Sequence, residues 1–249
     1  MRSLSAPEKQ RSFLDHLKEL RSRLIVLVIA FTAASVAGYM LYDSIISLLY
    51  SPFQSMPAVI ADYRLYITSL LEGFATRIKV SLIAGFVLSF PVHLFNAVGF
   101  VFPGLKPKEK SVVGWFLVTS TILVVVSLYY VYTFAAPLVV KVLTAQSFVP
   151  KSVGLMLNFG KNVFLIFQFI LAGLILFQLP LIAELLMVMN IVPRRKMAGA
   201  FRYIVVGIFV VAAILTPPDA VSQLMLALPL VVLFGLALLI AWIFRFGEG

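Results

Sequence analysis

The sequence predicts an all-α polytopic membrane protein that crosses the bilayer six times and forms one integral membrane domain, residues 1–249. Two observations support this prediction. First, 62% of the residues are hydrophobic and only 12% are charged, which is too little polar surface to cover a soluble globule. Second, most apolar runs are about 20 residues long, enough for a helix to cross about 30 Å of hydrocarbon.

The first 23 residues are predicted to form an amphipathic segment at the membrane surface. Phe13, Leu17 and Leu20 recur at helical spacing, and the polar residues between them can face water. We expect this helix to run directly into the first span, residues 24–42.

The second span is predicted at residues 80–102. The preceding segment, residues 43–79, mixes apolar residues with charges and Pro52, which indicates an ordered cap on the far side of the membrane. Pro91 lies inside the span, where a missing backbone donor should kink the helix.

The third and fourth spans are predicted at residues 112–136 and 163–191, on either side of a second outer loop at residues 137–162. Pro137 is expected to end the third span because proline disfavours helix continuation. Pro180 is expected to interrupt the fourth span in the same way.

The last two spans, residues 203–215 and 221–244, are predicted to be a short hairpin. The first of them has only about 13 apolar residues, which is short for a full crossing. The loop between them, residues 216–220, is expected to be shaped by Pro217, Pro218 and Asp219.

The distribution of basic residues predicts the orientation in the membrane. Six spans place both termini on one side, and that side carries 14 of the 20 Lys and Arg residues, against six on the other. The positive-inside rule therefore places both termini in the cytoplasm. Topology and anionic lipid account for the net charge of +10, so nucleic-acid binding is not expected.

Five motifs, in order along the chain, resemble the TatC family, the multispanning receptor of the twin-arginine protein translocase. They are HLKELRSRL at 16–24, SPF at 51–53, FVFPGLKPKEK at 100–110, FQLP at 177–180 and RYIVVGIFVVAAILTPPDAVSQLMLALPL at 202–230. The resemblance implies a receptor in the bacterial cytoplasmic membrane that binds twin-arginine signal peptides of folded precursors. It also implies export driven by the proton-motive force, single-span partners of the TatA and TatB type, and association with other copies of the receptor.

The resemblance assigns the signal-peptide site to Glu19, Arg21, Phe100, Pro103 and Glu109. Two carboxylates on one face suit paired arginines, because a guanidinium binds a carboxylate through two parallel hydrogen bonds and an ammonium does not. The residues alone leave an alternative open. Glu19 lies four residues before Arg23, the spacing of a surface ion pair, and Arg21 can anchor the helix to lipid.

The polar residues Gln178, Thr216 and Gln223 are predicted to form a docking surface for partner helices, since polar groups in hydrocarbon normally face another helix or a cavity. Packing within the bundle is the alternative. Many relatives have Glu at the position of Gln178, and the amide cannot ionise. Pro52, Pro91, Pro180, Pro217, Pro218 and Asp219 are assigned structural roles.

Two other classes of membrane protein are disfavoured. A solute or proton-coupled secondary transporter would show charged residues in mid-membrane and repeated halves, whereas here the spans are nearly free of charged residues and we find no internal repeat. An intramembrane hydrolase would need a nucleophile motif or a metal motif such as HExxH. We therefore expect no catalytic residues, no metal and no cofactor.

Overall fold

The computed structural model describes residues 6–55, 65–101, 107–145, 156–216 and 219–248. In chain order the helices are α1 (Ala6–Met40), α2 (Tyr42–Tyr50), the 3₁₀ helix η1 (Ser51–Ser55), α3 (Glu72–Val101), α4 (Pro107–Tyr130), the π-helical segment η3 (Val131–Ala135), α5 (Ala136–Leu143), α6 (Phe159–Leu176), α7 (Gln178–Val188), α8 (Arg194–Gly199), α9 (Phe201–Leu215) and α10 (Ala220–Ile243). Two two-residue strands, β1 (Leu65–Tyr66) and β2 (Leu157–Asn158), pair in parallel.

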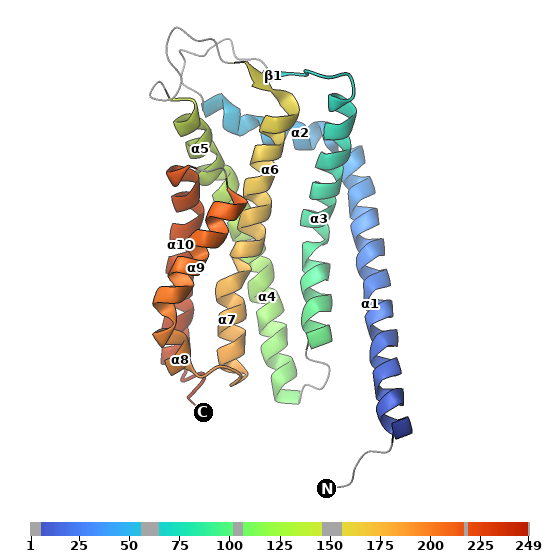
Figure 1. The fold of residues 1–249 in the computed structure, drawn as a ribbon, viewed down its shortest axis with the longest axis vertical. Coiled ribbons are helices and arrows are strands. Elements are labelled where there is room, and N and C mark those ends of the chain that lie inside the picture. The colour runs from blue at the N-terminus through green and yellow to red at the C-terminus, as the bar shows by residue number, and fades with distance from the viewer. Residues whose placement is uncertain (1–5, 56–64, 102–106, 146–155, 217–218, 249) are drawn as a thin grey trace.

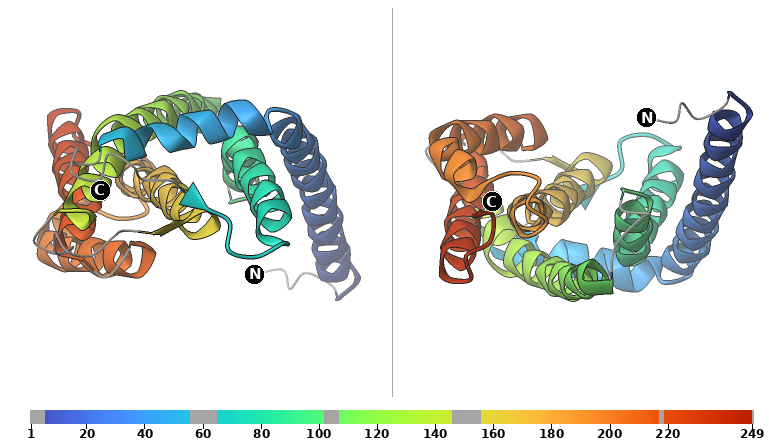
Figure 2. Two further views of the ribbon diagram at one scale, coloured as in Figure 1. Left: turned by 90° about the horizontal axis from the view of Figure 1, so that it is seen from above. Right: turned by 90° about the horizontal axis from the view of Figure 1, so that it is seen from below.

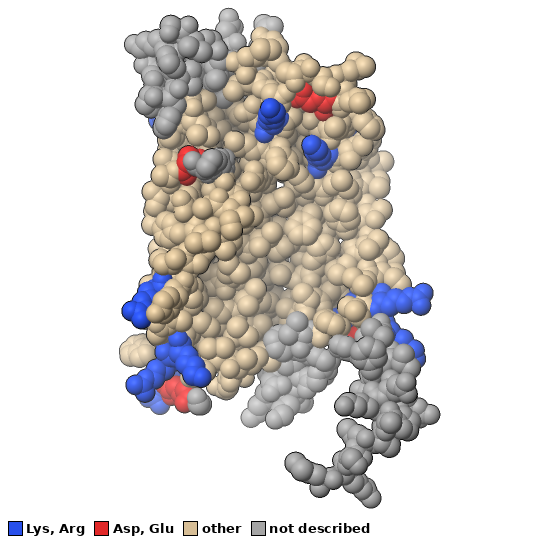
Figure 3. Space-filling model, in the orientation of Figure 1, with Lys and Arg blue, Asp and Glu red and all other residues tan. Residues whose placement is uncertain are grey.

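The described helices include five long, apolar units that can each cross a membrane. They are residues 18–40, 72–100, 111–143, 159–188 and 220–243, and α9 is a shorter apolar helix. On the face shown in Figure 3, the middle of the molecule carries no charged side chains, basic side chains are concentrated below it and fewer charges lie above. The chain is therefore a multi-pass membrane protein.

The long helices run along the longest axis of the molecule (Figure 1). The start of α1, the end of α3, the start of α4 and helix α8 lie at one end, which we call the lower end. Helix α2 and strand β1 lie at the opposite, upper end. Seen along the helix axes, α1 and the α9–α10 pair lie at opposite sides of the molecule (Figure 2).

Helix α6 lies at the centre of the packing and contributes to the two largest buried clusters. Its Phe169 packs with Val131 and Leu226, which joins α6 to the π segment and α10. Its Ile166 packs with Leu49 and Val80, which joins α6 to α2 and α3. Both faces of α6 are thus covered by protein, whereas α1 packs mainly on α3 and exposes much of its apolar surface.

Helices α1 and α3 approach each other closely in their upper halves. A Cβ atom added to Gly85 would lie 2.7 Å from the Ser35 backbone N and Cα, and one added to Gly38 would lie 3.0 Å from the Ser81 carbonyl. Small residues at such a crossing let two backbones approach, which is a common way for membrane helices to pack.

The second span begins earlier than predicted, because α3 starts at Glu72 and not near residue 80. The Glu72 carboxylate accepts hydrogen bonds from the Thr68 backbone N–H (2.6 Å), the Thr68 hydroxyl (2.8 Å) and the Gly160 N–H (2.8 Å). A carboxylate in the first turn also interacts favourably with the helix dipole. These contacts fix the start of α3 to the start of α6 at the upper end.

The expectation that Pro137 ends the third span was wrong. The π segment, residues 131–135, follows α4, and Pro137 lies in the first turn of α5, which continues to Leu143. Proline is tolerated there because the first turn of a helix does not use that N–H. The interruption near Pro180 was correct: α6 ends at Leu176 and α7 follows after one residue.

Of the two helices that were predicted to be short, α9 is short and α10 is not. Helix α9 has 15 residues, but α10 has 24, which at 1.5 Å per residue is enough for a full crossing. Pro229 lies inside α10 and does not end it. The expected continuity of the N-terminal amphipathic segment with the first span was correct, since α1 is one helix of 35 residues.

Candidate functional site

The predicted signal-peptide residues lie on three helices in the lower part of the molecule. Glu19 is on α1, Phe100 is in the last turn of α3, and Glu109 is in the first turn of α4. Pro103 lies outside the described residues, and the Glu109 side chain is not described. The fold therefore brings this part of α1 together with the end of α3 and the start of α4 in the lower part of the molecule.

The carboxylate of Glu19 is held by Arg23. Glu19 Oε1 accepts hydrogen bonds from Arg23 Nε (3.0 Å) and Nη2 (2.7 Å). The same guanidinium donates to α3, with Nη1 at 3.3 Å from the Asn96 carbonyl oxygen and Nη2 at 2.9 Å from that of Gly99. The ion pair that the sequence spacing allowed is present, and it also joins α1 to the end of α3.

Arg21 does not share in this contact. Its side chain is exposed and lines a shallow apolar depression with Leu20, Leu24 and Ile25 on the outer surface of α1. The resemblance placed Arg21 in the signal-peptide site, whereas among the described residues Arg23 is the arginine that contacts Glu19. The feature of the sequence that indicated this contact was the four-residue spacing between Glu19 and Arg23.

Gln178, the first residue of α7, faces the bundle interior. Its side chain is 3% exposed, and its Oε1 accepts a hydrogen bond of 2.6 Å from the Ser120 hydroxyl on α4. Its Nε2 has no hydrogen-bond partner among the described residues. The side chain thus joins α7 to α4.

Gln223 instead links α10 to α9, whereas Thr216 forms a hydrogen bond within the end of α9. The Thr216 hydroxyl donates to the Ala212 carbonyl (2.9 Å), and Gln223 Nε2 donates to the Phe209 carbonyl (2.9 Å). Asp219 caps α10 by accepting from the Ser222 N–H at 2.7 Å. Among the described residues, no hydrogen bond links Thr216 or Gln223 with Gln178.

The prolines that were assigned structural roles occupy several settings. Pro52 is buried in η1, Pro91 lies inside α3, and Pro180 is buried in α7. Pro217 and Pro218 lie outside the described residues.

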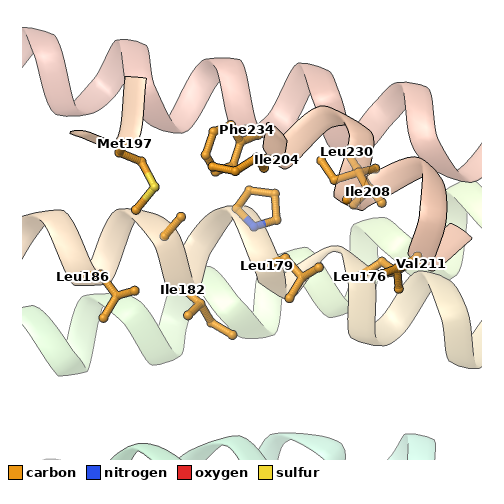
Figure 4. Close-up of a pocket in the computed structure, with 13 residues that line it drawn as sticks. Leu176, Leu179, Ile182, Leu186, Met197, Ile204, Ile208, Val211, Leu230 and Phe234 are labelled. Carbon is orange, nitrogen blue, oxygen red and sulfur yellow. The ribbon is translucent and has the colours of Figure 1, made fainter. Parts of the chain in front are cut away.

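An apolar cavity of about 330 Å³ lies between α7, α9 and α10 (Figure 4). Leu176 and Leu179 line it from one side, and Ile208, Leu230 and Phe234 line it from the other. The sequence interpretation did not find this cavity, because it forms between helices that are apolar on all sides and have no distinctive pattern.

Helix α8 carries a group of basic residues at the lower end of the molecule (Figure 3). Arg194 donates to Glu248 (3.1 Å) and to the Ala241 carbonyl (3.1 Å), which fixes α8 to the end of α10. His93 on α3 lies against Phe86, with the two ring centroids 5.3 Å apart. Within the described ranges, no three His, Cys, Asp or Glu side chains cluster as a metal site would require.

Comparison with known proteins gives one consistent result. The family model of the Sec-independent protein translocase protein (TatC) matches residues 15–229. The chain is 28% identical to a Sec-independent protein translocase protein TatC from Carboxydothermus hydrogenoformans, over 94% of both chains. It is 32% identical to one from Helicobacter pylori, over 91% of this chain and 85% of that protein.

A solved structure agrees with these relatives. The crystal structure of the twin arginine translocase receptor TatC in DDM matches with a TM-score of 0.79 and 27% identity, covering 90% of this chain and 98% of that one. The family consists of protein translocase components and not of enzymes. The chain therefore belongs to the TatC family and is a membrane subunit of the Sec-independent protein translocase.

Proposed function

We propose that this subunit binds signal peptides with paired arginines at its lower end and then recruits single-span partners for export driven by the proton-motive force. The observation that supports this most directly is the placement of the Glu19 carboxylate beside the last turn of α3. That helix leads to α4, which carries Glu109 in its first turn. Two acidic positions from separate helices thus lie at one face.

The chemistry of Glu19 is compatible with an incoming arginine. Arg23 uses only Oε1, and Oε2 accepts no hydrogen bond from the described residues. The side chain remains 37% exposed. A guanidinium of the peptide can therefore donate to Oε2, and a planar guanidinium matches a carboxylate better than the point charge of a lysine.

The experiment that tests this function compares two peptides on the purified protein. A signal peptide with an arginine pair is expected to bind in detergent at least about tenfold more tightly than the same peptide with a lysine pair. Equal affinities would contradict the proposed recognition.

The topology that this function requires places the lower end in the cytoplasm of a bacterial cell, with both termini there. The basic residues at that end support this orientation. Because the chain has no cysteine, single cysteines are specific probes. Ser111 is expected to be protected from an impermeant thiol reagent in intact cells and Ala220 to react; the reverse result would overturn the orientation.

We place partner docking on the α9–α10 connection, at Thr216 and Gln223. Gln178 was predicted to share this surface, but its side chain is buried and joins α7 to α4. Gln223 is only half-buried, and its Oε1 can accept a hydrogen bond from a partner side chain. Such interhelical bonds contribute about 0.6 to 2 kcal/mol each in membranes, which is enough to select a register.

The paired substitution Thr216→Val and Gln223→Leu is expected to reduce crosslinking to a TatA-type or TatB-type helix several-fold and to leave signal-peptide affinity unchanged. Both measurements are made on the same purified complex. Ser120→Ala, which removes the internal partner of Gln178, serves as the comparison variant. Equal loss of crosslinking and peptide binding would mean that Thr216 and Gln223 stabilise the receptor's own helices.

A further inference from the structure

We propose that Arg23 is a positioning residue for signal-peptide recognition: it fixes the Glu19 carboxylate against the end of α3 and thereby sets the selectivity for arginine. This inference rests on the proposed function of Glu19. It goes further because it assigns a role in recognition to Arg23, for which the sequence indicated only a surface ion pair with Glu19.

The first argument is the way α1 and α3 separate. Their backbones are in close contact in the upper half, at Ser35 and Gly85. Toward the lower end α1 diverges from α3 (Figure 1). Close backbone packing therefore does not position Glu19, and a longer connection is needed there.

Arg23 supplies that connection. A Cβ atom added to Gly99 on α3 would meet the Arg23 guanidinium, at 2.6 Å from Nη1, so this side chain spans the gap between the helices. The guanidinium makes four hydrogen bonds, two to Glu19 Oε1 and one each to the Asn96 and Gly99 carbonyls. Because these donors belong to one rigid plane, the carboxylate oxygen is fixed relative to the α3 backbone.

The electrostatics of the same contact preserve the negative charge of Glu19. A positive charge beside a carboxylate would normally weaken its attraction for a second cation. Here the guanidinium also lies on the carbonyls in the last turn of α3, which carry the partial negative charge of the helix C-terminus. Part of the Arg23 charge is therefore balanced by α3, and Glu19 can attract a peptide guanidinium through Oε2.

A lysine at position 23 cannot replace this contact. It keeps the positive charge, but an ammonium is a compact group that lacks the planar fork of N–H donors. Arg23→Lys should therefore leave the net charge unchanged while losing the fixed geometry. We expect the affinity for the arginine-pair peptide to fall about tenfold, the equivalent of one well-positioned hydrogen bond, and the affinity for the lysine-pair peptide to change little.

The separation of α1 and α3, which we propose that Arg23 fixes, can be measured without any peptide. Spin labels at Leu24 and Phe95, which are exposed positions on α1 and α3, report the separation of the lower halves. Labels at Val36 and Leu82, also exposed, report the upper halves. In Arg23→Gln the lower distance distribution is expected to widen and the upper one to stay unchanged.

The matched control is Arg202→Gln. Arg202 loses the same charge, but its guanidinium contacts Tyr203 on its own helix, α9. Neither distance distribution nor peptide selectivity is expected to change in this variant. A change equal to that of Arg23→Gln would mean that net charge, and not position, is responsible, and would overturn the inference.

The outcomes separate this inference from the function on which it rests. If Glu19→Gln leaves the arginine-pair affinity unchanged, the proposed function of Glu19 fails. If Glu19→Gln weakens binding but Arg23→Lys retains wild-type affinity and selectivity, only the role of Arg23 fails. Tighter binding by Arg23→Lys would show that Arg23 competes with the peptide and would also overturn the positioning role. The inference is supported if Arg23→Lys lowers the selectivity for the arginine-pair peptide and Arg23→Gln widens the distance distribution between the lower halves of α1 and α3.

Discussion

Replacing Gly85 with alanine is expected to loosen α1 from the rest of the protein. The added Cβ would lie 2.7 Å from the Ser35 backbone N and Cα, a distance that real Cβ atoms essentially never show. Rotation of a side chain cannot relieve a backbone contact, so α1 must move away from α3. Overpacking of this kind costs about 1 to 3 kcal/mol. We expect a clearly lower melting temperature in detergent.

Gly207→Ala on α9 is the matched control. A Cβ atom at Gly207 meets nothing within 4 Å, so the same chemical change adds no clash. Alanine also has the higher helix propensity at both positions, by about 1 kcal/mol, which works against the predicted effect at Gly85. Equal melting temperatures for the two variants would refute the close α1–α3 packing.

Glu109→Gln is expected to weaken the binding of an arginine-pair signal peptide by about 10- to 150-fold. A hydrogen bond to a charged group contributes about 1.5 to 3 kcal/mol, and each 1.4 kcal/mol is a factor of ten in affinity. Glutamine has nearly the same shape as glutamate but lacks its charge. Peptide titration of the purified variant, with a lysine-pair peptide alongside, measures the effect.

Two controls separate recognition from stability in this experiment. Glu248→Gln removes one carboxylate from the same end of the molecule, where Glu248 forms a partly exposed ion pair with Arg194. Exposed ion pairs contribute about 0 to 1 kcal/mol, so peptide affinity should not change. Glu109 also lies in the first turn of α4, where a carboxylate stabilises the helix. A fall in melting temperature that matched the loss of affinity would assign Glu109 to helix stability alone.

The sequence by itself determined the membrane character, the approximate positions of the spans and several irregularities within them. Apolar length defines a span because hydrocarbon has a fixed thickness, and this placed α9 as a short helix. Proline acts through its own missing N–H, which is why the break beside Pro180 was predictable. The motifs that resembled the TatC family were also readable, because they consist of local runs of residues.

The sequence could not place helix boundaries that depend on distant partners. Glu72 starts α3 because Gly160 and Thr68 donate to its carboxylate, and Gly160 is 88 residues away. Pro137 does not end a helix because the π segment before it changes the hydrogen-bonding pattern. The start of α3 therefore depends on a contact that the local sequence pattern does not contain.

The tertiary structure alone decided which polar and small residues meet. Lipid is as apolar as the side chains, so hydrophobic pattern does not show which side of a membrane helix contacts protein. The meeting of Ser35 with Gly85 depends on this choice of side. So do the contacts of Arg23 with the carbonyls of Asn96 and Gly99, which lie 73 and 76 residues further along the chain. The spacing of Glu19 and Arg23 indicated an ion pair, but only the packing of α1 on α3 turned that pair into a connection between two helices.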